Sequence, residues 1–303
     1  MHKRTILSLL FIALCSPSLK AANIDSAAST DKPSIEHVML LALDGFSAPG
    51  LKQARTPNID KLAQDGTFLS RSRGVMPTKS APNWASILSG VYPSHHGIHS
   101  NQWWWFRCTR RLEYPTLFSA IKSADAKNQT ATIFEWDDFG KLFHPKDLDH
   151  NQWVGDWDTT TQEVTKLLDK GTPKFTVIHL VSADIAGHDH SWTSSEYIQG
   201  IEFVDSQVGT IVEKLKSNGT FDKTLLVLAT DHGGVDDGHG GDSDVELYTN
   251  VVFHGPGIKK GLRLKGMTQN VDITATLYDV LQLTPEASLQ GIPLKIIWEK
   301  QSP

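Results

Sequence analysis

Runs of apolar residues that end in acidic segments are the main pattern of this sequence. Residues 38–43 run into Asp44, residues 175–181 precede Asp184, and residues 224–230 run into Asp231. Apolar runs of this length are typical of strands that are buried on both faces of a parallel sheet. The pattern therefore predicts three central parallel strands.

Helical patterns separate these runs. Helices are expected at 56–63, from Ser80 to about Leu88, at 117–124 and at 194–216, and a further strand is expected at 130–134. The alternation of strands and helices predicts an α/β fold, built as a three-layer sandwich around a mostly parallel central sheet. Ligands bind such sheets outside the carboxyl ends of the strands, so the acidic residues there are candidate site residues.

The composition is that of a globular protein. The chain has 303 residues, of which 39% are hydrophobic and 21% are charged. Its formal net charge of −5 gives no electrostatic footprint for nucleic acid, so no specific binding to a nucleic-acid duplex is expected. We find no repeat and no linker that separates a second domain. Residues 35–303 are therefore predicted to form one catalytic domain, with a small insertion at about 100–155.

The first 22 residues have the pattern of a signal peptide. A basic start is followed by the apolar run 6–14 and by small residues up to Ala22. We therefore expect an exported protein, periplasmic or secreted, with a flexible leader at 23–34. The apolar run is shorter than the ~20 residues of a membrane span. Cys15 raises the alternative of a lipoprotein anchor, but Leu14 before it is a poor fit to such a site.

Four polar segments carry the candidate chemistry. Their Asp and His residues are Asp44, Asp184, His188, Asp231, His232 and His239. Mixed carboxylate and imidazole ligands suit Zn²⁺ or a similar ion. Six ligands are enough for two divalent ions, which at about 4 Å from each other can clamp the attacking and leaving oxygens of a displacement. Ser80 lies at a predicted helix N-terminus, which favours an anion, and is the candidate nucleophile.

Read together, these segments resemble the alkaline phosphatase superfamily, and most closely its nucleotide pyrophosphatase/phosphodiesterase branch. That branch carries an Asp-Gly strand end, then Pro-Thr-Lys-Thr-Phe-Pro-Asn, then Gly-x-Tyr-Pro-x-x-His-Gly-Ile, and a later Asn. In this chain they stand as Asp44 with Gly45, residues 77–83, residues 90–98, and Asn101. The resemblance covers roughly residues 36–295.

The resemblance implies an alkaline-phosphatase-like fold and a set of residue roles. Asp44, Asp231 and His232 would hold one ion, with Ser80 bridging, and Asp184, His188 and His239 would hold the other. Asn101 would donate to a non-bridging phosphoryl oxygen. The implied reaction passes through a covalent phospho- or nucleotidyl-serine, which metal-activated water hydrolyses. The implied substrate is a small-molecule phosphate ester or a nucleotide.

Some residues near the motif differ from the family pattern, and others have two possible roles. Ser80 replaces the usual Thr of the phosphodiesterase branch. Trp103 and Trp104 follow Asn101 closely, and one of them is expected to stack on a base or to cover an apolar leaving group. The alternative is that these rings pack an irregular insertion. Lys79 adjoins the nucleophile and is a candidate for phosphate binding, or else points to solvent.

Three other functions compete with phosphodiester or pyrophosphate hydrolysis. A phosphomonoesterase would need a cation, such as Arg107 or Arg110, at the terminal phosphate. A sulfatase would need Arg where Trp84 stands, in the motif that begins at Ser80. A catalytically inactive metal-binding protein is the third alternative, although all seven core positions have the required chemistry.

Overall fold

A nine-stranded sheet forms the centre of the computed structural model, which describes residues 35–102 and 110–299. The strands are β1 His37–Leu43, β2 Thr67–Arg73, β3 Thr130–Phe134, β4 His150–Trp153, β5 Phe175–Leu180, β6 Thr224–Thr230, β7 Tyr248–His254, β8 Leu262–Leu264 and β9 Thr268–Gln269. Their order is β4-β3-β5-β1-β6-β7-β2-β8, and β9 pairs with β2. Among the named strands of the described residues, β7 pairs antiparallel with β6 and with β2, and the other pairs are parallel. The prediction of a mostly parallel sheet is confirmed.

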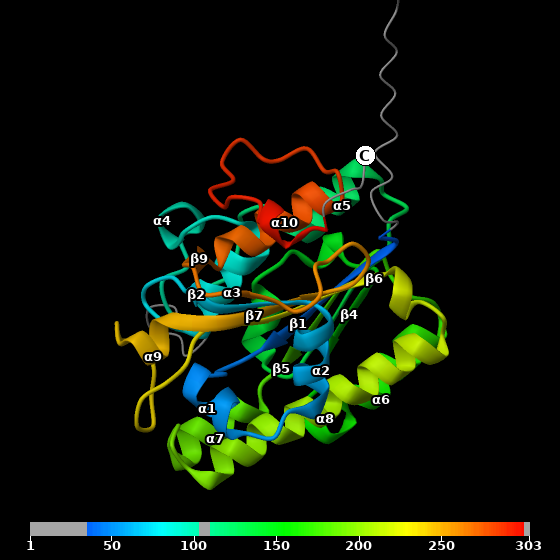
Figure 1. Ribbon diagram of the computed structural model, residues 1–303. Coiled ribbons are helices and arrows are strands. Elements are labelled where there is room, and N and C mark those ends of the chain that lie inside the picture. Colours follow the sequence, from blue (N-terminus) through cyan, green and yellow to red (C-terminus); the bar gives the residue numbers. More distant parts are fainter. Residues whose placement is uncertain (1–34, 103–109, 300–303) are drawn as a thin grey trace, which may run out of the picture. The chain divides into compact units, whose positions relative to one another are not determined.

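Helices cover both faces of the sheet and complete the predicted three layers (Figure 1). The helices are α1 Ala48–Gln53, α2 Pro57–Asp65, α3 Ser80–Ser89, α4 Pro93–His96, α5 Leu117–Ala124, α6 Thr160–Asp169, α7 Ser182–His190, α8 Ser195–Ser217, α9 Asp244–Leu247 and α10 Val271–Val280. Helices α3, α5 and α10 pack on one face, and α2, α6 and α8 pack on the other. Within the described residues, no helix is long and apolar enough to cross a membrane.

Strand β1 shows why the central strands are apolar throughout. Side chains alternate across a strand, so Leu40 belongs to the core on the α3 face while Leu41 belongs to the core on the α8 face. Both side chains are at most 1% exposed. A strand that is covered on both sides needs no polar face, and this is the physical reason for the unbroken apolar runs.

One element differs from the sequence-based expectation. Helix α7 was not among the predicted helices, and it contains the polar segment from Asp184 to His188. Asp184 and His188 are four residues apart, so their side chains lie one above the other on the same helix face. Helix α7 contains few apolar residues, and its extensive packing against α8 stabilises it.

The remaining expectations concern domain organisation. Strands β3 and β4, from the stretch 100–155, belong to the central sheet. The insertion and the single catalytic domain stay predictions. The signal peptide, the leader, Trp103 and Trp104 lie outside the described residues.

Candidate active site

Three neighbouring parallel strands bring the predicted carboxylates to one edge of the sheet. Strand β1 lies between β5 and β6, with Leu43 opposite both Leu180 and Thr230. Asp44 and Asp231 follow their strands directly, and Asp184 lies in the first turn of α7 after β5. The backbone N–H of Gly45 donates to Asp231 Oδ1 at 3.2 Å.

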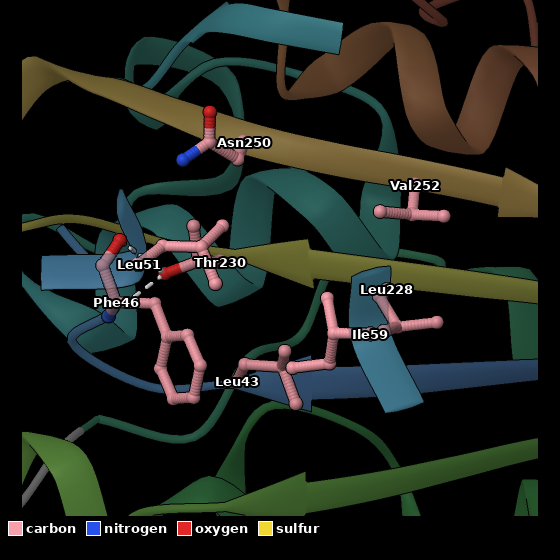
Figure 2. A pocket seen from close by; sticks show the side chains of 8 residues that line it. All are labelled: Leu43, Phe46, Leu51, Ile59, Leu228, Thr230, Asn250 and Val252. Atoms are coloured by element: carbon pink, nitrogen blue, oxygen red, sulfur yellow. Dashed lines mark hydrogen bonds between the residues drawn. The ribbon is translucent and has the colours of Figure 1, made fainter. Parts of the chain in front are cut away.

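A second hydrogen bond ties the same strand ends together. The N–H of Phe46 donates to Thr230 Oγ1 at 3.1 Å, a contact that Figure 2 shows as a dashed line. These two side chains, with Leu43, Leu51, Ile59, Leu228, Asn250 and Val252, line a small, largely apolar pocket. The pocket borders the strand ends, but it contains none of the candidate ligands.

The first candidate ion site is fully buried. Asp44, Asp231 and His232 can place one ligand atom each within 4.8 Å of one another, and each residue is at most 1% exposed. Ser80 Oγ lies 3.1 Å from His232 Nε2 and 3.4 Å from Asp44 Oδ1. The structure therefore brings the predicted nucleophile to the predicted ligands.

The second candidate ion site lies beside the first. His188 Nε2 is 3.1 Å from His239 Nε2 and 3.7 Å from Asp184 Oδ2. Asp184 Oδ1 lies 3.9 Å from His239 Nε2. The His188 side chain is 43% exposed, so this group opens to solvent. The rings of His232 and His239 are stacked with centroids 3.7 Å apart, which joins the two groups.

The three histidines all direct Nε2 toward the candidate ion sites, while Nδ1 bonds to a backbone carbonyl. His188 Nδ1 bonds to the carbonyl of Asp237 at 2.9 Å, His232 Nδ1 to that of Gly233 at 3.0 Å, and His239 Nδ1 to that of Thr78 at 2.8 Å. A carbonyl only accepts, so each Nδ1 carries the proton and each Nε2 presents a lone pair. Two facing lone pairs repel each other unless a cation lies between them, so this arrangement fits metal ligands.

The carboxylates support the same conclusion. Burial raises the pKa of both Asp184 and Asp231 well above the usual value, and the nearby Asp44 charge raises them further. Neither Asp184 Oδ1 nor Asp231 Oδ2 finds a hydrogen-bond partner within residues 35–102 and 110–299. Burying charged oxygens without partners is costly, and divalent ions would remove this cost.

The imidazoles are suited to bind as neutral ligands. Burial lowers the pKa of His232 to about 3, and burial also lowers the pKa of His239. Both rings are therefore neutral at physiological pH, as metal coordination requires. The residues present therefore fit divalent metal ions, and the ligand atoms cluster in two groups, Asp44 with Asp231 and His232, and Asp184 with His232 and His239.

Asp44 is held by two residues that sequence reasoning did not assign to the site. Trp84 Nε1 and His179 Nε2 each lie 2.8 Å from Asp44 Oδ2, and both side chains are fully buried. Burial alone would raise the pKa of Asp44, but hydrogen bonds and charge from His179, together with Trp84, hold it well below its usual range. The second oxygen, Oδ1, remains directed to Ser80 and His232. A histidine within a buried strand was the one signal that could have revealed His179.

Ser80 begins helix α3, at the helix N-terminus that the sequence predicts, and its hydroxyl lies next to Asn101. Asn101 Oδ1 accepts from the backbone N–H of Ala81 at 2.8 Å, and Asn101 Nδ2 lies 3.4 Å from Ser80 Oγ. This arrangement fixes the amide with its N–H₂ group toward the nucleophile. The side chain of Lys79 lies across Gly240, because a Cβ added there would come 3.0 Å from Lys79 Cε. Lys79 is therefore directed along the His239 loop.

Thr78 joins the nucleophile segment to the same loop. Its hydroxyl donates to the carbonyl of Gly241 at 2.6 Å and accepts from the N–H of Gly240 at 3.1 Å. Its own carbonyl accepts from His239 Nδ1. Thr78 is fully buried, and it fixes both the position and the tautomer of His239.

The fold is alkaline-phosphatase-like, as expected from the sequence. Residues 38–249 match the family model of type I phosphodiesterases / nucleotide pyrophosphatases, and the chain belongs to this family. Venom phosphodiesterase 2 of Crotalus adamanteus is 27% identical over 228 residues, which cover 65% of this chain and 26% of the venom enzyme. The chain thus matches about a quarter of the length of its curated relatives.

Solved structures agree on the fold. An inactive form of murine ectonucleotide pyrophosphatase / phosphodiesterase 5, in complex with AMP, matches with a TM-score of 0.74 at 14% identity and covers 87% of this chain and 100% of that chain. A 2-O GAG sulfatase matches with a TM-score of 0.70 at 19% identity, covering 88% of this chain and 75% of that chain. At these identities the likeness shows the shared fold.

Proposed function

We propose that this chain is an exported, two-metal hydrolase of phosphodiesters or nucleotide pyrophosphates, with Ser80 as its nucleophile. The observation that carries the proposal is the position of Ser80 Oγ, 3.1 Å from the inward-facing Nε2 of His232 and 3.4 Å from Asp44 Oδ1. The family membership supports the reaction class. Residues 1–22 are the proposed export signal.

The ligands divide between two ions. Asp44, Asp231 and His232 would hold the buried ion together with Ser80, and Asp184, His188 and His239 would hold the more open one. Zn²⁺ fits this mixture of imidazole and carboxylate ligands. When bound, the ions supply positive charge at the attacking, leaving and non-bridging oxygens.

His232 is a poor general base for Ser80, because burial lowers its pKa to about 3. The serine hydroxyl therefore releases its proton to water, and the charge of its surroundings, including the N-terminus of α3, favours the alkoxide that remains. As Ser80 Oγ bonds to phosphorus, the bond to the leaving-group oxygen breaks and a phosphorylated or nucleotidylated serine forms. Water then cleaves the Oγ–phosphorus bond and restores the hydroxyl.

Asn101 and Lys79 would bind the phosphoryl group. The Asn101 N–H₂ group lies 3.4 Å from Ser80 Oγ and would donate to a non-bridging oxygen as negative charge develops there. Lys79 extends along Gly240 beside the more open ligand group and would attract the anionic substrate. A nucleotide ester is the preferred substrate class, which the AMP complex of the murine relative supports.

The experiment is a substrate panel with purified, Zn²⁺-loaded protein and its Ser80 variants. Bis-p-nitrophenyl phosphate, a nucleotide pyrophosphate, p-nitrophenyl phosphate and p-nitrophenyl sulfate are compared by kcat/KM. Ser80→Ala should reduce hydrolysis to background, whereas Ser80→Thr should keep measurable activity because it retains the hydroxyl. Ser94→Ala is the matched control, since Ser94 is exposed on α4.

Three results would redirect the proposal. Preference for the monoester would make the chain a phosphomonoesterase, and preference for the sulfate would make it a sulfatase. Full activity of Ser80→Ala would reject the nucleophile. Intact-protein mass spectrometry after a rapid acid quench should find the covalent adduct in the wild type and not in Ser80→Ala.

A further inference from the structure

The indole of Trp192 lies behind both ligand groups. Trp192 stands between α7 and α8, and only 4% of it is exposed. The residue before it, Ser191, has φ 86° and ψ 145°, a conformation that non-glycine residues rarely adopt. The indole lies against α7, where it contacts Gly187 and His188. The backbone N–H of Trp192 then donates to the carbonyl of Asp236 at 2.8 Å.

Trp192 touches a glycine in each of three ligand segments. Its Nε1 donates to the carbonyl of Gly45 at 3.0 Å. A Cβ added to Gly187 would come 2.7 Å from the indole ring, and one added to Gly234 would come 2.3 Å from it. Distances this short leave no room for a side chain, so both glycine backbones pack directly on the ring.

These glycines neighbour ligands of both ions. Gly45 follows Asp44, Gly187 precedes His188, and Gly234 lies two residues after His232. The His188 ring also packs edge-on against the indole, with centroids 4.9 Å apart. One rigid ring is therefore in contact with the segments that hold both ligand groups.

We propose that Trp192 is a positioning residue that sets the separation of the two ions. The inference rests on the proposed two-metal function. A smaller side chain would let α7, which carries Asp184 and His188, move relative to the strand ends that carry Asp44 and His232. The ring is buried beneath the ligands, so its effect on the reaction passes through the ligand positions.

The test compares Trp192→Phe with the wild type, each loaded with Mn²⁺ as a spectroscopic probe. Electron paramagnetic resonance measures the coupling between two Mn²⁺ ions, which depends on their separation. The wild type should bind two ions and show coupling consistent with a spacing of about 3.5–4 Å. Trp192→Phe should weaken binding of one ion by about 10- to 100-fold and alter the coupling at saturating Mn²⁺. Its kcat should fall more than its KM rises.

A second pair of variants guards against simple misfolding. Gly234→Ala should disturb the wild type because its methyl group meets the indole, but it should cost less in the Trp192→Phe background, where the ring is smaller. Gly266→Ala is the control, because a Cβ there meets nothing within 4 Å. Far-UV circular dichroism checks the fold of each variant.

The outcomes separate the two proposals. A wild type that binds fewer than two ions would overturn both the two-metal function and the role of Trp192. A wild type with two coupled ions, and a folded Trp192→Phe variant of unchanged coupling and affinity but lower thermal stability, would overturn only the role of Trp192. Additive effects of Trp192→Phe and Gly234→Ala would count against it as well.

Discussion

Trp84→Phe removes one of the two hydrogen bonds to Asp44 Oδ2. The indole N–H lies 2.8 Å from Asp44 Oδ2, and the ring is fully buried against Phe139, with centroids 6.0 Å apart. Phenylalanine keeps a six-membered ring at this position but has no donor. His179 remains as the other donor to Oδ2.

The expected loss follows from two contributions. A hydrogen bond to a charged group contributes about 1.5–3 kcal/mol, and its loss leaves a buried carboxylate oxygen with fewer partners. The missing part of the indole leaves a small cavity, which costs about 1 kcal/mol more. We therefore expect Trp84→Phe to lower the free energy of unfolding of the metal-free protein by about 3 kcal/mol. A domain with about 5–15 kcal/mol of stability would remain folded.

The loss should depend on pH in a defined direction. Asp44 has a folded-state pKa below its unfolded value, so its favourable contribution is present above the usual carboxyl range and is lost as pH falls through the folded-state pKa. The difference between wild type and Trp84→Phe should hold at neutral pH and narrow only in strong acid. Zn²⁺ affinity should fall by about 10- to 100-fold as the orientation of Asp44 loosens.

Urea unfolding, followed by far-UV circular dichroism in the presence of a chelator, measures this loss. The matched control is Trp157→Phe, because Trp157 is 37% exposed and should change stability by no more than about 0.5 kcal/mol. A Trp84→Phe variant as stable as the control, with unchanged Zn²⁺ affinity, would refute the reasoning.

Two further substitutions test the ligand groups. Thr78→Val keeps the shape of the side chain but loses both hydroxyl contacts to the His239 loop. It should therefore weaken Zn²⁺ binding about tenfold or more in a chelator competition titration. Thr78→Ser should bind Zn²⁺ nearly as well as the wild type, and equal affinities of the Val and Ser variants would contradict the role of the hydroxyl. Asp231 has a raised folded-state pKa, so its contribution to stability is full below its unfolded pKa and is lost as pH rises through the folded-state pKa. Metal-free Asp231→Asn should therefore melt at a higher temperature than metal-free wild type at mildly alkaline pH, but not in acid. Zn²⁺ should stabilise the variant less than it stabilises the wild type, because only the ligand group without Asp231 stays intact. A melting temperature below that of the wild type at every pH would show that the buried Asp231 charge does not destabilise the metal-free fold.

The strands and the ligand types could be predicted from the sequence because both depend on local pattern. The run at 38–43 matches β1 closely, and 224–230 matches β6, since strands covered on both faces are apolar throughout. The helix expected at 194–216 is α8, which begins one residue later and is capped by the Ser194 side chain. Asp44 and Asp231 were expected at one sheet edge, and they lie there.

The residues behind the ligands could not be predicted, because only the tertiary structure brings them into contact. Trp84 and Asp44 are 40 residues apart in sequence, and His179 and Asp44 are 135 apart. Nothing in the local pattern at Trp192 indicates that three glycine-bearing segments meet on its ring. Helix α7 was not predicted for a similar reason. Its sequence has no apolar stripe, and its packing against α8 stabilises it instead.

The wide spacing of the ligand segments also determines when metal can act during folding. Gly45 and Asp231 are 186 residues apart, and Ser80 and His232 are 152 apart. Closing such loops costs entropy that one ion cannot offset before the central strands have paired. In small zinc domains, by contrast, nearby ligands allow the ion to start folding. Here the ions would bind a nearly finished sheet, so they should slow unfolding far more than they speed folding.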